Sequence, residues 1–167
     1  MKQINNYIVE KLKLNKNTGT VEYNYHPETA DELRKLLKKL ISERGKDADL
    51  NDIDVSKIEK LSPIKNPWRD GYDGLFEDLD PHNIDISKWD VSNATGFGAM
   101  FWNCANFDCD LSDWDMSKAK EINTMFRGCK KFTAKGLENW NIKNVKGMKD
   151  VFMGCNESII PSWYKNR

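Results

Sequence analysis

Four cysteines and two histidines are the residues of this chain best suited to chemistry. Cys104, Cys129 and Cys155 lie 25 and 26 residues apart, whereas zinc sites use close pairs such as Cys-x2-Cys, which the chain lacks. His26 and His82 each adjoin a proline, and the sequence contains no G-x-S-x-G, P-loop or H-E-x-x-H motif. We therefore expect a protein that is not an enzyme and that uses no cofactor or metal.

The cysteine spacing belongs to a longer repeat, which must position these side chains. A phenylalanine follows each tryptophan of the repeat after 12 residues, and a cysteine follows three residues later. Apolar and polar residues alternate over residues 111–116, and apolar residues then recur at spacings of 3, 4 and 3, which predicts a strand followed by a helix. One such coil cannot cover its own apolar face, so we expect the coils to stack and to bury the thiols. The recurring residues are Trp89, Trp114 and Trp140, Phe101, Phe126 and Phe152, and the three cysteines named above.

The chain divides into a cap and a repeat region that form one structural unit. Residues 1–46 predict a β-β-α cap, with strands at 7–14 and 21–25 and a helix from Thr29 to about Arg44. Residues 47–167 predict about four coils. A stretch at 62–74 contains two prolines and two glycines and reads as an inserted loop.

The repeat resembles the BspA-like leucine-rich-repeat family of bacterial surface proteins over about residues 47–163. The resemblance implies a leucine-rich-repeat-like solenoid that binds proteins or host surfaces. We therefore expect an α/β fold, a solenoid of short parallel strands and helices behind the N-terminal β-β-α cap. The residues that carry the resemblance are Trp89-Asp90-Val91-Ser92-Asn93, Met100-Phe101, Cys104 and Phe107, with their counterparts one and two repeats later.

Charge is balanced over the whole chain and strongly sorted along it. Residues 47–115 carry 5 basic and 16 acidic side chains, a net charge of −11, whereas residues 116–167 carry 11 basic and 4 acidic side chains, a net charge of +7. Such sorting steers charged partners and favours one docking orientation.

Three groups of residues are candidates for binding a partner. The strand of each coil predicts outward acidic columns, because carboxylates alternate there with apolar residues. The inserted loop brings together residue types that are common in binding hot spots, and Trp102 stands at a variable position of the repeat, which suggests exposure. The candidates are Asp52, Asp54, Asp90, Asp113 and Asp115 in the columns, Trp68, Arg69 and Tyr72 in the loop, and Trp102.

We therefore expect a non-catalytic protein–protein recognition module whose partner has a basic surface. One hypothesis is an inhibitor of a nucleic-acid-handling protein, since an acidic face can occupy a groove built for phosphates. Two alternatives stay open, an adhesin-like surface-binding fragment and direct nucleic-acid binding by the basic ends. The sequence shows no secretion signal and no membrane-length apolar run, so we expect a cytoplasmic protein without membrane contact. The basic residues of the nucleic-acid alternative are Lys118, Lys120, Arg127, Lys130, Lys131 and Lys135.

Overall fold

The computed structural model describes residues 22–165 apart from residues 63 and 66–71. Its longest helix is α2 (Ala30–Arg44), which confirms the helix predicted from the sequence. The Thr29 side chain accepts a hydrogen bond from the Glu32 amide at the first turn, and the Gly45 amide returns to the Ile41 carbonyl at the last. The buried side of α2 consists of Leu33, Leu37, Leu40 and Ile41.

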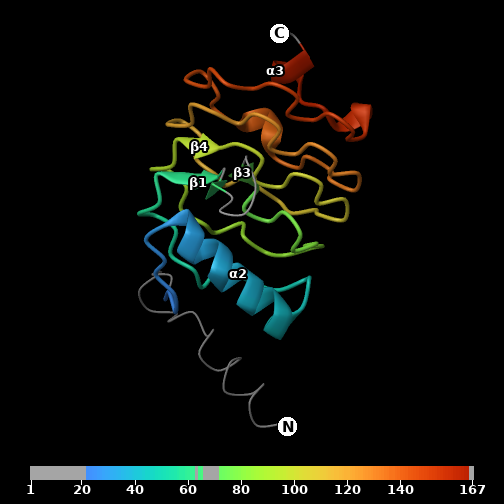
Figure 1. The fold of residues 1–167 in the computed structure, drawn as a ribbon. Coiled ribbons are helices and arrows are strands. Elements are labelled where there is room, and N and C mark those ends of the chain that lie inside the picture. The colour runs from blue at the N-terminus through green and yellow to red at the C-terminus, as the bar shows by residue number, and fades with distance from the viewer. Residues whose placement is uncertain (1–21, 63, 66–71, 166–167) are drawn as a thin grey trace, which may run out of the picture.

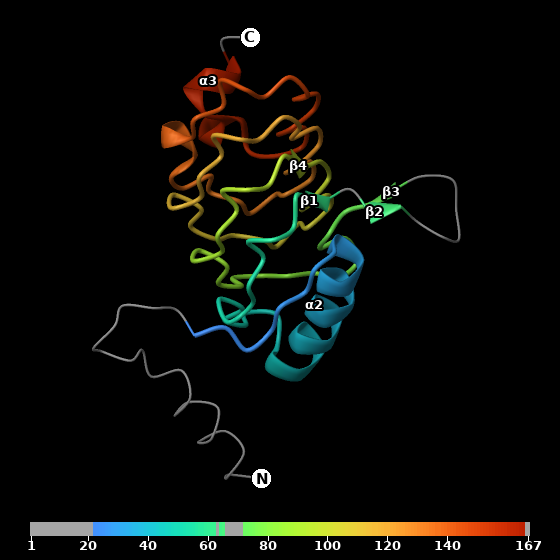
Figure 2. The same ribbon diagram turned by 90° about the vertical axis from the view of Figure 1, so that its left-hand side faces the viewer.

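The strands are very short. Strand β1 (Lys60–Ser62) pairs in parallel with β4 (Gly96–Phe97), with Lys60 opposite Gly96 and Ser62 opposite Phe97. Strands β2 (Ile64–Lys65) and β3 (Tyr72–Asp73) form an antiparallel pair that projects to one side of the molecule (Figure 2). Four residues of the stretch expected to be an inserted loop therefore form an antiparallel strand pair.

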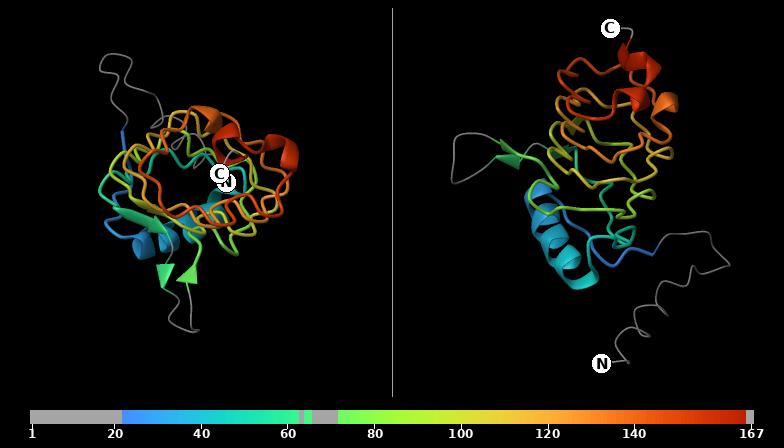
Figure 3. Two further views of the ribbon diagram at one scale, coloured as in Figure 1. Left: turned by 90° about the horizontal axis from the view of Figure 1, so that it is seen from above. Right: turned by 90° about the vertical axis from the view of Figure 1, so that its right-hand side faces the viewer.

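Most of the remaining chain runs in turns that lie over one another, and we call each turn a layer (Figure 1 and Figure 3). Three layers span residues 86–110, 111–136 and 137–163. Backbone hydrogen bonds join each layer to the next: the Phe97 amide donates to the Glu121 carbonyl at 2.9 Å, and the Ile122 amide donates to the Gly147 carbonyl at 2.7 Å. The layers are thus connected through main-chain atoms in the manner of neighbouring strands.

Aromatic side chains from successive layers fill the core. The Trp114 ring stacks between Trp89 and Trp140, with centroid distances of 6.4 Å and interplanar angles of 5° and 2°. The rings of Phe101 and Phe126 stack in the same way at 5.5 Å. Large buried rings are the main source of apolar burial in such a core, so residues at equivalent repeat positions occupy equivalent places.

The expected α/β fold class is wrong. Among the described residues, the only α-helices are α2 and the four-residue α3 (Ser162–Lys165), and the one parallel sheet is the two-stranded β1–β4 pair. The layers therefore have little regular structure and do not form a leucine-rich-repeat-like solenoid of strands and helices. The helix predicted from the spacing of Ala119, Ile122 and Phe126 is absent because Thr124 has a φ of 55° and Gly128 a φ of 80°, values that interrupt a right-handed helix.

The two ends of the stack differ. Helix α2 lies at one end, where the Arg34 guanidinium donates to the carbonyls of Gly74, Leu75 and Glu77. The other end holds the 3-10 helix η2 (Glu157–Ile159) and α3, while the 3-10 helix η1 (Leu137–Asn139) begins the last layer. Of the expected cap, residues 1–21 lie outside the described residues, and Tyr25 forms an isolated parallel bridge with Ile53.

Candidate partner-binding site

Two predicted acidic residues lie on the surface in successive layers. Asp90 and Asp115 are exposed, and within the described ranges neither forms an ion pair. One carboxylate oxygen of each accepts the backbone N–H of the serine two residues on, Ser92 at 3.0 Å and Ser117 at 2.9 Å. This is a side-chain-closed turn, so each aspartate shapes its own layer and leaves its other oxygen for solvent or a partner.

Asp54 belongs to the same column but is less available than Asp90 and Asp115. Its side chain is 16% exposed and accepts hydrogen bonds from the Ser56 amide and hydroxyl, while His26 Nδ1 lies 3.3 Å from its other oxygen. Burial raises the pKa of the Asp54 carboxyl, but the hydrogen bonds from Ser56 and His26 outweigh this, so the pKa lies below its ordinary value. The Asp54 carboxylate is therefore engaged mainly in hydrogen bonds within the protein.

The prediction that Asp52 faces outward is wrong. Its side chain is 4% exposed, and both of its carboxylate oxygens accept from the Arg44 guanidinium, at 2.8 and 2.9 Å. Asn24 adds a third hydrogen bond at 3.0 Å. Strand alternation does not hold here, because the Asp52 side chain turns inward to pair with Arg44 in the last turn of α2. A carboxylate paired in this way holds the fold together and is not accessible to a partner.

The remaining sequence candidates divide between the surface and the hairpin. Asp113 is 65% exposed, and its carboxylate lies 3.2 Å from the Lys88 ammonium of the layer before. Trp68 and Arg69 lie outside the described residues, in the connection between β2 and β3. Tyr72 is the first residue of β3. The predicted binding roles of Trp68, Arg69 and Tyr72 therefore stay predictions.

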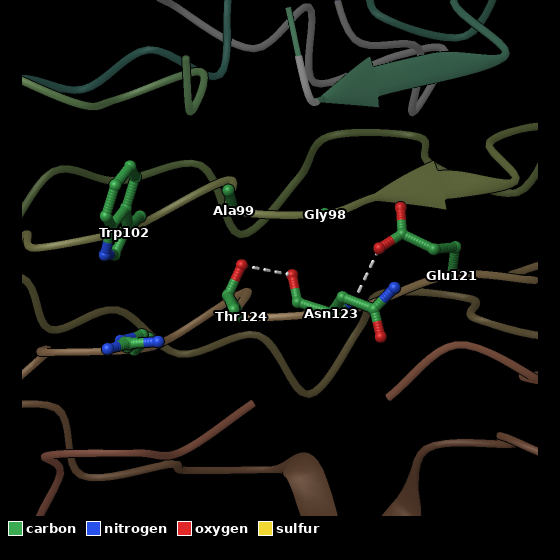
Figure 4. Close-up of a pocket in the computed structure, with 7 residues that line it drawn as sticks. Gly98, Ala99, Trp102, Glu121, Asn123 and Thr124 are labelled. Atoms are coloured by element: carbon green, nitrogen blue, oxygen red, sulfur yellow. Dashed lines mark hydrogen bonds between the residues drawn. The ribbon is translucent and has the colours of Figure 1, made fainter. Parts of the chain in front are cut away.

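Trp102 lines a pocket of about 330 Å³ formed between two successive layers (Figure 4). Gly98, Ala99 and Trp102 come from the layer of residues 86–110, and the other lining residues come from the next layer. Gly98 leaves the space that Glu121 occupies, since a Cβ atom there would lie 2.5 Å from the Glu121 Oε2 atom. The residues of the second layer are Glu121, Asn123, Thr124 and Arg127.

Several polar groups of this pocket already have partners. Glu121 Oε1 accepts the Asn123 amide N–H at 2.9 Å, and the Thr124 hydroxyl donates to the Asn123 carbonyl at 2.7 Å (Figure 4). Asn123 Oδ1 accepts the Lys149 amide at 2.7 Å. The Glu121 and Asn123 side chains are thus fixed by the backbone, and Glu121 Oε2 and Asn123 Nδ2 have no hydrogen-bond partner within the described part of the chain.

The indole of Trp102 differs from those of the repeat tryptophans. Trp114 donates its Nε1–H to the Ile86 carbonyl at 3.1 Å, and Trp140 donates to the Leu111 carbonyl at 3.0 Å. Trp89 donates in the same way to the Leu50 carbonyl at 2.9 Å, and Trp163 donates to the carbonyl of Leu137, at the start of its own layer, at 2.7 Å. Over residues 22–165, gaps excepted, Trp102 alone among the tryptophans donates to no protein atom. Its half-buried ring therefore presents an unused donor at the surface.

Trp102 begins a row that crosses the layers. Arg127 and Met153 hold the equivalent positions of the next two layers. Arg127 lies 3.7 Å from Asp150 and is partly exposed, and Met153 is 54% exposed, the one large hydrophobic residue that is openly exposed within the described ranges. We call Trp102, Arg127 and Met153 the Trp102 row. Sequence reasoning singled out Trp102 but missed the pocket, because the pocket exists only when two layers are placed together.

The basic residues proposed for nucleic-acid binding are partly engaged within the protein. The Lys118 ammonium donates to Asn93 Oδ1 at 2.7 Å, and Lys135 pairs with Asp110 at 2.5 Å. The hydrogen bond from Lys135, aided by Ser112, holds the pKa of Asp110 at about 2. Lys120, Lys130 and Lys131 are exposed.

The cysteines are free thiols, with Cys104 and Cys129 buried and Cys109 and Cys155 half-buried. Burial raises the pKa of Cys104 to about 12 and that of Cys155 to about 11. In the described part of the chain, no group of three or more His, Cys, Asp or Glu side chains could hold a metal ion. The described helices also include none with the length and apolarity needed to cross a membrane.

A family model described as "Mycoplasma protein of unknown function, DUF285" matches residues 35–163. The chain belongs to the DUF285 family. This finding corrects the resemblance to the BspA-like leucine-rich-repeat family, which is not the family whose model matches. The DUF285 match covers residues 35–46 of the expected cap region, which include most of α2, as well as all three layers. No curated protein and no solved structure matches the chain.

Proposed function

We propose that this DUF285 protein is a non-catalytic recognition module that binds another protein through the Trp102 row. The observation that carries the proposal is the Trp102 indole, which is half-buried beside a pocket and has an Nε1–H without an acceptor among the described residues. Tryptophan, arginine and methionine are enriched at protein interfaces, and tryptophan and arginine dominate binding hot spots.

The composition of the row supports a binding role over a packing role. One residue before each member of the row, the chain places Phe101, Phe126 and Phe152, which are buried and stacked. The packing of these rings thus requires phenylalanine at this position in all three layers. The row itself carries an aromatic, a cationic and a thioether side chain, so packing between layers does not dictate which residue stands there.

The pocket suggests what the partner inserts. Its volume of about 330 Å³ suits one side chain better than a large ligand. The Trp102 ring offers an apolar wall, and the fixed Glu121 carboxylate offers an acceptor. A partner side chain with an apolar stem and a hydrogen-bond donor at its end, such as lysine or arginine, fits both features.

The acidic column supports a second contact with a partner of basic surface. Asp90 and Asp115 are exposed in successive layers, and each has one carboxylate oxygen that accepts from no donor in the described part of the chain. Inhibition of a nucleic-acid-handling protein would place these carboxylates in a phosphate-binding groove. Asp90→Asn combined with Asp115→Asn would then weaken binding, and the difference from the unmodified protein would shrink at high salt.

Site-specific photo-crosslinking tests the proposal. A photoreactive phenylalanine derivative replaces Trp102 in one variant and Asn139, an exposed residue of η1, in a control variant. The proposal predicts a discrete protein adduct from position 102 that position 139 does not give. Equal adducts from both positions would contradict the proposal. Adducts to nucleic acid, together with a mobility shift at low salt, would instead favour the basic residues as the binding surface.

A further inference from the structure

Over one stretch of the repeat, every main-chain hydrogen bond between layers has its donor in the earlier layer and its acceptor in the next. In the layer of residues 86–110, alternate amides donate to carbonyls of the next layer, including Ala99 to Asn123 at 2.8 Å and Phe101 to Met125 at 2.9 Å. The layer of residues 111–136 repeats the pattern with the amides of Thr124, Phe126 and Gly128, which donate to Lys149, Val151 and Met153 at 2.8, 3.0 and 2.9 Å.

The last layer has the same donors, but no layer lies beyond it within the described residues. Asp150, Phe152 and Gly154 stand at the positions of Thr124, Phe126 and Gly128. Within the described ranges, the amides of these three residues donate to no atom. We call these amides the open edge. Because these three residues alternate along the chain, their amides form a row of donors on one side of the last layer, as the amides of Thr124, Phe126 and Gly128 do in the layer before.

The backbone at the open edge already has the conformation that makes these bonds elsewhere. Asp150 has a φ of 55° and Gly154 a φ of 79°, the same as Thr124 at 55° and close to Gly128 at 80°. No rearrangement is therefore needed before acceptors can bind. The rings of Trp163 and Tyr164 pack against the Phe152 ring, while Met153 and Gly154 are exposed beside it. The core at this end is thus covered by side chains, whereas its amides remain unpaired.

We propose that an extended, acidic segment of a partner protein adds to the open edge as a further strand, with alternate carbonyls accepting from Asp150, Phe152 and Gly154. Such strand addition is a common mode of peptide recognition, in which main-chain bonds give affinity and side chains give specificity. The proposal goes beyond binding by the Trp102 row, because it uses other atoms and does not require Trp102. A segment seated here would place a side chain next to Met153.

Charge selects the occupant. Residues 116–167 carry 11 basic and 4 acidic side chains, and Lys146 and Lys149 are exposed in the last layer. A second copy of this chain is a poor occupant, because α2 at the opposite end exposes Lys35, Lys38 and Lys39. Two open edges facing each other would likewise bring like charges together. The exposed acidic residues Asp90, Asp113 and Asp115 lie in the two layers whose corresponding amides are already paired.

Amide hydrogen exchange and peptide titration, both followed by NMR, test this proposal on the whole chain. The probe is a capped nine-residue peptide of alternating glutamate and valine, and the matched control peptide alternates lysine and valine. In the free protein we expect the open-edge amides to exchange at least 100-fold faster than those of Thr124, Phe126 and Gly128. On addition of the glutamate peptide, exchange at the open edge should slow at least ten-fold, and the lysine peptide should have no such effect.

Variants at the two ends separate charge selection from general damage. Lys146→Glu combined with Lys149→Glu should weaken glutamate-peptide binding at least ten-fold, whereas Lys35→Glu on α2 should leave it unchanged. Slow exchange at the open edge in the free protein would overturn the proposal. So would equal binding of the two peptides, or sedimentation showing that a second copy occupies the edge. Trp102→Ala should bind the peptide normally, so failure of the Trp102 row as a site would not be mistaken for failure here.

Discussion

The thiol of Cys129 donates a hydrogen bond of 3.0 Å to the carbonyl oxygen of Phe101 in the preceding layer. Cys155 and Phe126 have the same relationship one layer later, at 2.9 Å. Each cysteine of the repeat therefore fills a small apolar space and satisfies a carbonyl where the layers meet. This use of the thiol accounts for the recurrence of cysteine without a metal or a disulfide.

The buried thiols should resist alkylation in the folded protein. Burial raises the pKa of Cys104 to about 12, so only about one thiol in ten thousand is ionised at pH 8. Iodoacetamide should leave Cys104 and Cys129 unmodified in native buffer and modify all four cysteines in urea, as mass spectrometry would show. Any early labelling should occur at the half-buried Cys109 and Cys155. Rapid labelling of Cys129 in the native protein would refute the packing described above.

Gly136 should be intolerant of a side chain for two separate reasons. Its φ is 83°, and a Cβ atom there would lie 2.3 Å from the Cβ atom of Ser112, at the start of the same layer. Gly45 offers a matched control, because its φ is 94° but nothing lies within 4 Å of its Cβ position. We expect Gly45→Ala to lower the free energy of unfolding by about 1 kcal/mol from backbone strain, and Gly136→Ala by about 3 kcal/mol or more. Urea denaturation measures both, and equal losses would show that Gly136 is not in close contact with Ser112.

Asp52 should make stability depend on pH. Burial raises the pKa of its carboxyl, but the hydrogen bonds from Arg44 and Asn24 lower the pKa by more than burial raises it. The folded-state pKa therefore lies below the ordinary value of 3.8. This contribution to stability is present above the ordinary pKa and is lost as the pH falls through the folded-state value. Asp52→Asn should therefore cost about 1–3 kcal/mol at pH 7 and progressively less below about pH 4.

Asp113→Asn is the control for that measurement. Asp113 is 65% exposed and pairs with Lys88, which is 60% exposed, so its loss should change the free energy of unfolding by less than about 0.5 kcal/mol. Urea denaturation of both variants at pH 7 and pH 3 gives the comparison. A loss of unfolding free energy that does not change with pH in Asp52→Asn would mean that the charge of the carboxylate paired with Arg44 does not stabilise the fold.

Trp114 should stabilise the protein through the hydrogen bond of its ring nitrogen as well as through the apolar surface that its ring buries. The Trp114 ring is 3% exposed, and its Nε1 atom lies 3.1 Å from the Ile86 carbonyl oxygen. Trp114→Phe leaves that buried carbonyl without its donor and should cost about 1–3 kcal/mol. Trp102→Phe, which removes a nitrogen that has no protein acceptor, should change stability by less than about 0.5 kcal/mol. Thermal unfolding of the two variants distinguishes the two kinds of tryptophan.

The repeat in the sequence identified which residues are equivalent but not the local structure between them. Trp114 and Phe126 lie in the core, as their recurrence predicts. The expected strand at residues 111–116 is absent, because Asp115 closes a turn onto the Ser117 amide instead of extending the chain. Side-chain spacings of 3 and 4 fit a helix and a tightly turning chain equally well, and only the left-handed Thr124 and Gly128 decide between them.

The candidate site was predictable only in part. The variable repeat position pointed to Trp102, and period-2 alternation pointed to Asp90 and Asp115, which are exposed. Alternation failed at Asp52, since Arg44 comes from a helix whose docking the sequence does not show. The sequence likewise does not show the contact between Gly98 and Glu121, because these two residues belong to different layers.

Trp102→Ala, measured for both stability and partner binding, tests the central claim most directly. We expect the free energy of unfolding to fall by no more than about 1.5 kcal/mol, because the ring is half-buried. Capture of the partner crosslinked at position 102 should fall at least ten-fold, while the exposed control Asp113→Asn retains it. Unchanged capture by a folded Trp102→Ala protein would contradict the account.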